Sequence, residues 1–168
     1  MTEVLEQQEE DRRPPMLLVL SILSLISIGL SLILTLFQFA SGPLDEDEIM
    51  KQRVDMATLK SDLRKAGMTQ FVAFYDKIQA MSEETNDKFY LSSVVTLLTY
   101  LIGLFGVIFM LRRRKLGFHM YIVYCLLAIG GMLLYVSPEN IPIMVPIVSL
   151  ILSGLFIFLY SRTLHWMK

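Results

Sequence analysis

Four long stretches of the chain contain no Asp, Glu, Lys or Arg. These stretches cover residues 14–44, 89–111, 116–138 and 140–161. A helix of about 20 apolar residues crosses a bilayer, and such uninterrupted runs are uncommon in soluble proteins. The pattern therefore predicts an all-α membrane protein, folded as an antiparallel bundle of four transmembrane helices. The expected spans are about 16–39, 89–111, 117–136 and 142–160.

Between the first two spans, residues 41–88 form the only sizeable polar segment, and their pattern predicts two short amphipathic helices. Asp45 and Glu48 have the spacing of a capping box at a helix start, and Gly67 suits a helix end. A second helix is expected from about Thr69. Because no strong helix breaker lies between residues 82 and 89, this second helix can continue without a break into the second span. The apolar positions that recur at helical spacing in the first helix are Ile49, Met56, Leu59 and Leu63.

The first apolar stretch could also belong to a signal peptide. From Met16 to Phe39 the apolar region has 24 residues, whereas a signal peptide has an apolar core of about 7–15 residues after a basic segment. Here the preceding residues are mostly acidic. We therefore expect a retained span, with residues 1–15 as an acidic cytoplasmic tail and 16–168 as a single four-span membrane domain.

Proline marks the start of the fourth predicted span. Pro142 lies near its first residue, and Pro146 lies one turn further along. A proline inside a helix removes a backbone hydrogen bond and clashes with the preceding turn. We therefore expect a kink or a loosened turn at Pro146.

The orientation of the bundle follows from the distribution of basic residues. Arg112, Arg113, Arg114 and Lys115 form a dense cluster between the second and third spans. Short loops rich in Lys and Arg remain in the cytoplasm. We therefore expect both termini in the cytoplasm and residues 41–88 on the opposite side. The same cluster is expected to contact anionic lipid headgroups, and docking of a cytoplasmic partner is the alternative.

Small polar residues recur every three or four positions in the first two spans. In lipid, such stripes let helices approach closely, and their hydroxyls can bond across the contact. They fit either the seams of the protein's own bundle or faces that pack against another membrane protein. The stripe of the first span includes Ser24, Ser27, Ser31 and Thr35, and that of the second span includes Thr96, Thr99, Gly103 and Gly106.

Candidate chemistry is sparse in this sequence. Pumps, proton relays and voltage sensors use ionisable groups inside the membrane, and the four apolar stretches contain no acidic or basic side chain other than His119, near the basic cluster. No nucleophile motif, metal-binding motif or phosphate-binding loop is present. We therefore expect no enzymatic activity, no catalytic residue, no cofactor and no metal. A net charge of −1 gives no reason to expect a nucleic-acid partner.

The second polar helix carries a face of larger apolar side chains. Two short helices rarely form an independent core, so their apolar faces need a cover. Helix-on-helix packing with some membrane contact is one possibility. A partner protein is the other, since aromatic residues are favoured at interface hot spots. The candidate partner-binding residues are Phe71, Phe74, Tyr75 and Ile78.

The layout of the chain resembles that of claudin-like four-span proteins. A claudin first loop contains a tryptophan motif and a cysteine pair, however, and residues 41–88 contain neither. The chain is more similar to small four-span proteins of Bacteroidota. Those proteins also have an acidic tail, an Arg-Pro before a Leu/Ser/Ile/Gly-rich span, and a later basic run followed by Gly-Phe and Tyr-Ile. The matching positions here are Arg13-Pro14, Arg112–Lys115, Gly117-Phe118 and Tyr121-Ile122.

This resemblance implies a bacterial inner membrane and supplies no site residues. The sequence favours a non-enzymatic accessory subunit or scaffold of a larger membrane protein complex. Such a subunit would dock through its small-residue faces and through the helical segment 41–88. A small homo-oligomeric channel or carrier for a neutral or lipidic solute is the second hypothesis. A membrane enzyme that acts on lipid is the third.

Overall fold

The computed structural model describes residues 14–167, so most of the predicted acidic tail lies outside the described residues. Within that range the chain forms α-helices, short 3-10 turns and loops, and no strand. The fold is therefore all-α, as the charge-free stretches predicted. The α-helices are α2 (Pro15–Ser41), α3 (Glu46–Lys65), α4 (Thr69–Asp87), α5 (Phe89–Leu111), α6 (Lys115–Gly130) and α7 (Met144–Ser161).

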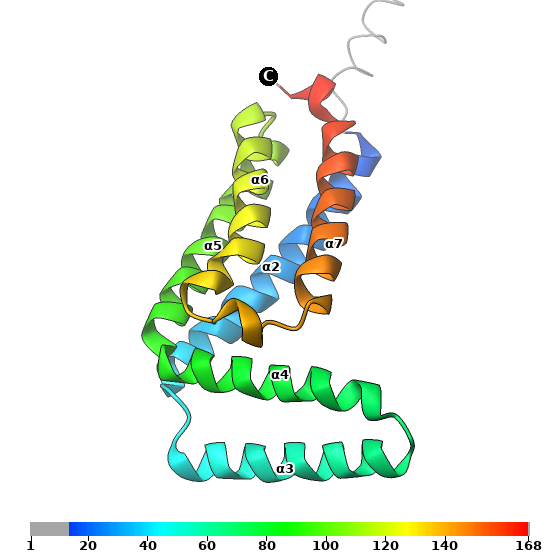
Figure 1. The fold of residues 1–168 in the computed structure, drawn as a ribbon. Helices are drawn as coiled ribbons and strands as arrows, with labels where there is room; N and C mark the ends of the chain where they lie inside the picture. The colour runs from blue at the N-terminus through cyan, green and yellow to red at the C-terminus, as the bar shows by residue number, and fades with distance from the viewer. Residues whose placement is uncertain (1–13, 168) are drawn as a thin grey trace, which may run out of the picture.

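Four segments are long and apolar enough to cross a membrane, which makes this a multi-pass membrane protein. They are α2, α5, α6 with the 3-10 turn Gly131–Leu134, and α7. The four segments run alternately up and down (Figure 1). The start of α2, the turn 112–114 and residues 162–167 meet at one end, here called the basic end. The hairpin α3–α4 and residues 131–143 form the opposite end, here called the hairpin end.

The small-residue stripes follow a seam of about 3.5 residues per repeat, the period of left-handed helix packing. Ser27 lies outside that seam and is exposed, so it is not part of the contact between the helices of the bundle. The seam continues from Ser24 to Ile28, four residues on, and then to Ser31, three residues on, so that it does not include Ser27. The seam of α2 consists of Leu17, Ser21, Ser24, Ile28, Ser31 and Thr35, and that of α5 of Ser92, Thr96, Thr99, Gly103, Gly106 and Met110, all buried or half-buried.

Glycines bring the backbones of α5 and α6 into direct contact. A Cβ atom on Gly117 would lie 2.4 Å from the Met110 backbone nitrogen and 2.5 Å from the Gly106 carbonyl oxygen. A Cβ atom on Gly103 would lie 2.7 Å from the ring of Tyr124. Only residues without a side chain fit this contact. The α5 stripe is therefore an internal seam of the bundle.

The most densely buried core lies in the half of the bundle nearest the basic end. Leu17, Val107, Met110 and Tyr160 are each 0% exposed. The Tyr160 hydroxyl donates to Ser24 Oγ at 3.0 Å, which links α7 to α2 in the bundle interior. Two other stripe hydroxyls instead bond their own helices. Thr35 donates to the Ser31 carbonyl, and Thr99 donates to the Val95 carbonyl.

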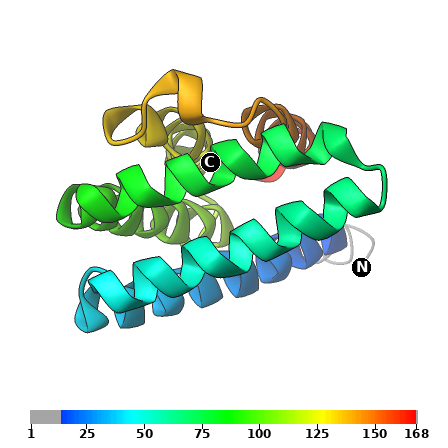
Figure 2. The ribbon, with the colours of Figure 1, turned by 60° about the horizontal axis from the view of Figure 1, so that its bottom comes forward.

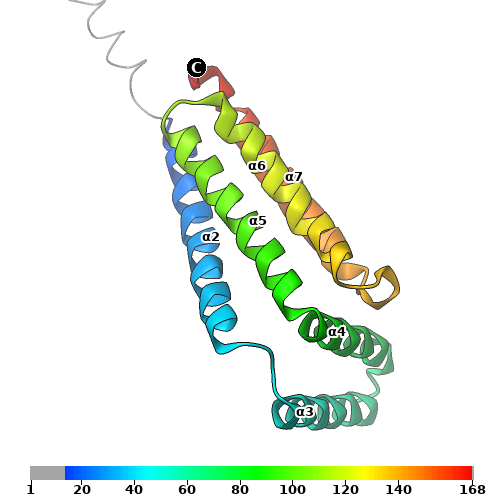
Figure 3. The ribbon, with the colours of Figure 1, turned by 90° about the vertical axis from the view of Figure 1, so that its left-hand side faces the viewer.

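The predicted continuity between the second polar helix and the second span is wrong. α4 ends at Asp87, and the chain turns sharply at Lys88 before α5 begins (Figures 1 and 3). At this corner the Ser92 hydroxyl lies within hydrogen-bonding distance of the Thr85 carbonyl, at 3.3 Å, and of the Phe89 carbonyl, at 2.9 Å. Ser92 therefore supplies a donor for a carbonyl that loses its helical partner at the end of α4.

The third and fourth spans also differ from their predicted bounds. The α-helix of the third span ends at Gly130, and a 3-10 turn continues it to Leu134. α7 begins at Met144 rather than at residue 142, so Pro146 falls in its first turn. A missing N–H has no intrahelical partner to lose there. Pro146 therefore breaks no hydrogen bond within α7, and the reason to expect a kink there does not apply.

The glycine contact generates a stability prediction. We expect Gly117→Ala to destabilise the bundle by about 1–3 kcal/mol, because the added methyl group meets backbone that cannot move away cheaply. Gly154→Ala is the matched control, since nothing lies within 4 Å of its would-be Cβ atom. There the helix preference of alanine should leave stability equal or slightly higher. Denaturation in mixed detergent micelles measures both, and equal losses would contradict the α5–α6 contact.

Candidate functional site at the hairpin end

The hairpin end is built on two antiparallel helices that cross the end of the bundle (Figure 2). α4 lies next to the spans, and α3 lies farther out (Figures 1 and 3). At the start of α3 the predicted capping box is present, with Asp45 and Glu48 each accepting a hydrogen bond from the other's N–H. At its end, Gly67 has a φ of 74° and Met68 N–H donates to the Leu63 carbonyl. Glycine adopts that conformation without steric cost, which closes the hairpin.

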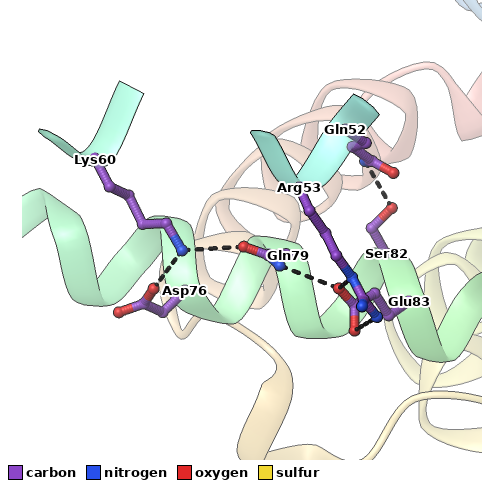
Figure 4. A network of polar contacts seen from close by, with 7 residues as sticks. All are labelled: Gln52, Arg53, Lys60, Asp76, Gln79, Ser82 and Glu83. Atoms are coloured by element: carbon purple, nitrogen blue, oxygen red, sulfur yellow. Dashed lines mark hydrogen bonds and ion pairs between the residues drawn. The ribbon is translucent and has the colours of Figure 1, made fainter. Parts of the chain in front are cut away.

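Polar side chains join α3 to α4 along the hairpin (Figure 4). The Arg53 guanidinium donates to both carboxylate oxygens of Glu83, at 2.9 and 3.1 Å. Lys60 Nζ lies 2.8 Å from Asp76 Oδ1 and 3.0 Å from Gln79 Oε1. Single surface pairs contribute little, about 0–1 kcal/mol each. A bidentate arginine contact and a second pair further along nevertheless fix the register of the two helices.

Two further side chains attach the hairpin to the bundle. Asn86 exchanges two hydrogen bonds with the backbone of Leu44, which ties the link after α2 to the end of α4. Glu84 accepts hydrogen bonds from the Ser137 N–H and from the Asn140 side chain, in the turn between the last two spans. The hairpin is therefore tied to three of the connections that surround it, including the Ser92 corner.

The carboxylates of Glu84 and Glu83 are held in their charged form. The hydrogen bond from the Ser137 N–H holds the pKa of Glu84 below the ordinary value of 4.5, and the Asn140 amide acts in the same direction. The hydrogen bond from Arg53 likewise lowers the pKa of Glu83 from 4.5. Both side chains are therefore anions at neutral pH, as these hydrogen bonds require.

Three of the four candidate partner-binding residues line two separate hollows. Phe71, 45% exposed, and Phe74 line a mostly apolar groove of about 540 Å³ between α4 and the residues 142–144 that lead into α7. Ile78 instead lines a more polar hollow of about 570 Å³ with the link 42–44 and α3. Tyr75 is half-buried and packs its ring edge-on to Phe74 at 5.6 Å. The four side chains therefore do not all line one hollow, and their role in partner binding stays a prediction.

Met50 and Val54 of α3 were not among the apolar positions that helical spacing assigned to one face of this helix. No residue of α3 is buried, and Met50 and Val54 are 60% and 56% exposed. They are one helical turn apart, so they lie on the same side of α3. Leu59 on the same helix is 39% exposed. Exposed apolar side chains on the spans face lipid, whereas α4 and its connections separate α3 from the spans (Figure 3).

The remaining candidates lie elsewhere. Thr99, Gly103 and Gly106 are buried in the bundle, so these residues of α5 are not open to a partner. Arg112, Arg114 and Lys115 are exposed at the basic end, and Arg113 is half-buried there. No group of three or more possible metal-ligating His, Cys, Asp or Glu side chains occurs among residues 14–167.

No family model, curated protein or solved structure matches this chain. The function is therefore inferred from the geometry of the hairpin end. Sequence reasoning found the two helices and their caps, but it did not single out Glu84 or Asn86. Each of these side chains bonds a segment more than forty residues away, 42 for Asn86 and 53 for Glu84 with Ser137. No local pattern marks such a pair.

The Glu84 contact predicts an acid-sensitive junction. Because its pKa is lowered on folding, Glu84 stabilises the protein above its unfolded pKa, and this contribution is lost as the pH falls through the folded value. We expect Glu84→Gln to lower the melting temperature at pH 7 and to reduce the further loss on acidification below about pH 4.5. Thermal unfolding across pH measures both effects.

Glu139→Gln is the matched control for this prediction, because Glu139 is an exposed glutamate in the same turn as Ser137 and Asn140. It should keep the wild-type melting temperature at pH 7 and the wild-type acid response. A Glu84→Gln variant that behaves like this control would show that the junction does not depend on the Glu84 carboxylate.

Proposed function

We propose that this protein is a non-enzymatic accessory subunit or scaffold of a larger membrane protein complex, with the hairpin α3–α4 as its docking element. The observation that carries the proposal is the exposed apolar side of α3 at Met50 and Val54. These side chains are 60% and 56% exposed on a helix that is separated from the spans by α4. We infer that a partner protein packs against these apolar side chains, because exposed apolar patches mark protein–protein contacts.

The bracing of the hairpin supports the same proposal. Binding to a flexible segment loses free energy to ordering, and a surface fixed in advance avoids that loss. Here Arg53–Glu83 and Lys60–Asp76 fix α3 on α4, and Glu84 fixes α4 on the bundle. Because the α5 seam is occupied within the bundle, the hairpin is the better candidate for docking than the small-residue stripe.

The proposal includes an orientation in the membrane. The basic end faces the cytoplasm of a bacterium, the hairpin stands on the other side of the inner membrane, and Arg112–Lys115 contact anionic headgroups. The dense basic cluster Arg112–Lys115 lies in the short turn between α5 and α6, at the basic end. That distribution agrees with retention of the basic end in the cytoplasm.

Co-purification tests the docking role. Tagged protein at native expression level, extracted in mild detergent, is expected to bring a stoichiometric partner that mass spectrometry identifies. The double variant Met50→Gln, Val54→Gln should lose that partner by about tenfold or more, since central apolar contacts dominate interface energies. Its melting temperature should match the wild type, because both side chains are largely exposed.

Met68→Gln is the control, because it makes the same exchange at a methionine of the hairpin turn that is 42% exposed. It should retain the partner. If the double variant also retains every partner, α3 is not the docking surface. Recovery of the chain alone, or only with copies of itself, would favour the small channel or carrier instead, and solute flux into reconstituted liposomes would then test that function.

A further inference from the structure

The apolar groove between α4 and the start of α7 has the composition of a small-molecule site. Its volume is about 540 Å³. Such sites have volumes of about 300–1,000 Å³, are mostly apolar, and hold a few polar groups that orient the ligand. Among the described residues that line the groove, Lys77 is the only charged one and Gln70 is uncharged and polar. The apolar lining includes Phe71, Ala73, Phe74, Ile143 and Met144.

The positive charge of Lys77 has no partner in the described part of the chain. The side chain is exposed, and residues 14–167 offer it neither an ion pair nor a hydrogen bond. The neighbouring Asp76 pairs instead with Lys60 of α3, at 2.8 Å. The residues one helical turn away on α4, at positions 73, 74, 80 and 81, are uncharged. An anionic group that enters the groove therefore meets an ammonium group and no lining carboxylate.

The groove is continuous with a side of α7 that faces lipid. α7 is one of the candidate membrane spans, and its first turn stands over α4 (Figure 1). Met144 lines the groove and is 61% exposed, and Ile147 and Val148, one turn further along, are also exposed. A hydrocarbon chain in the groove can therefore extend along α7. A lysine at the edge of a membrane keeps its charged group in the headgroup layer.

We propose that this groove binds a single-chain anionic amphiphile of the fatty-acid class, with its carboxylate at Lys77 and its hydrocarbon chain between α4 and residues 142–144. The ammonium group donates charge-assisted hydrogen bonds to the carboxylate. Phe71 and Phe74 pack against the chain from the side of α4. One ammonium group and one apolar groove suit one anionic head and one chain.

The site is separate from the docking surface of the proposed complex subunit. Docking uses Met50 and Val54 on α3, and neither residue lines the groove. Loss of the fatty acid therefore leaves the partner bound, and loss of the partner leaves the fatty acid bound. Each proposal can fail without the other.

Photolabelling locates the ligand. The full-length protein in phosphatidylcholine nanodiscs is labelled with a palmitic acid that carries a diazirine in the middle of its chain, and mass spectrometry identifies the labelled residues. We expect labelling at residues 71–74 and 143–144 that excess palmitate abolishes. Excess methyl palmitate, whose head group is neutral, should leave most of it. Leu150 and Ile151, exposed on the span α7, are the internal control, and their labelling should not saturate.

Two results of this competition would overturn the proposal. One is labelling of the groove that methyl palmitate abolishes as well as palmitate does, because the charge of the head group would then be irrelevant. The other is labelling of the groove that does not saturate, as at Leu150 and Ile151, because the groove would then be ordinary lipid-facing surface.

Variants test the two halves of the site. Lys77→Gln should raise the half-saturating concentration of the photoactivatable acid about five-fold or more, because it removes the cation. Lys51→Gln makes the same exchange at an exposed lysine of α3 and should leave that concentration unchanged. Ala73→Leu fills the groove and should raise the concentration about tenfold or more, whereas Ala57→Leu on the exposed surface of α3 should not. No effect of Lys77→Gln, or equal effects in variants and controls, would overturn the site.

Two further measurements keep the result decisive. Phosphatidylglycerol added to the nanodiscs should not displace the label, and displacement at the same mole fraction as palmitate would assign the groove to a two-chain phospholipid and overturn the proposal. The melting temperatures of the variants should match the wild type, since Lys77 and Ala73 are exposed. Should a variant fail to fold, the competition between palmitate and methyl palmitate on the wild type decides the proposal.

Discussion

Where the chain leaves a helix, its backbone N–H and C=O groups need new hydrogen-bond partners. At the hairpin end the side chains of Glu84, Asn86 and Ser92 are these partners, and the position of the hairpin depends on them. Glu84 accepts a hydrogen bond from the Ser137 N–H, and Asn86 bonds the backbone of Leu44. The Ser92 hydroxyl lies within hydrogen-bonding distance of the Thr85 carbonyl in the last turn of α4. These three contacts therefore decide where α4 points, and through α4 they decide where α3 stands.

The two ends of the bundle are stabilised by different physics. Towards the basic end, the glycines of α5 and α6 bring two backbones together, and the side chains around Tyr160 are closely packed. At the hairpin end, the connections are polar and run between short segments outside the spans. A closely packed bundle provides a rigid base, and the polar contacts hold a hairpin on it at a defined orientation. Such a division suits a subunit that is anchored at one end and presents a surface at the other.

Features of the structure that depend on neighbouring residues were predicted from the sequence, whereas features that depend on contacts between distant residues were not. The charge-free stretches, the Asp45–Glu48 capping box and the turn at Gly67 are local patterns, and all of these elements are present in the structure. The sequence did not predict the break at Lys88, because no helix-breaking residue marks it. The direction of α4 instead depends on contacts that Glu84 and Asn86 make with residues far away in the sequence. The exposed position of Ser27 follows from the 3.5-residue seam, which spacing by threes and fours alone does not resolve. The exposure of Met50 and Val54 on α3 depends on the position of α4 between α3 and the spans, which no local pattern indicates.

The central claim is that the hairpin holds one orientation on the bundle. The most direct test is the distance between spin labels at Thr58 on α3 and Leu150 on α7, both exposed, with the buried Cys125 replaced by alanine. Pulsed electron spin resonance in lipid nanodiscs gives the distribution of that distance. A single narrow distribution is predicted at neutral pH. A broad distribution, or several populations, would show that the hairpin moves freely and would contradict a docking surface fixed in advance.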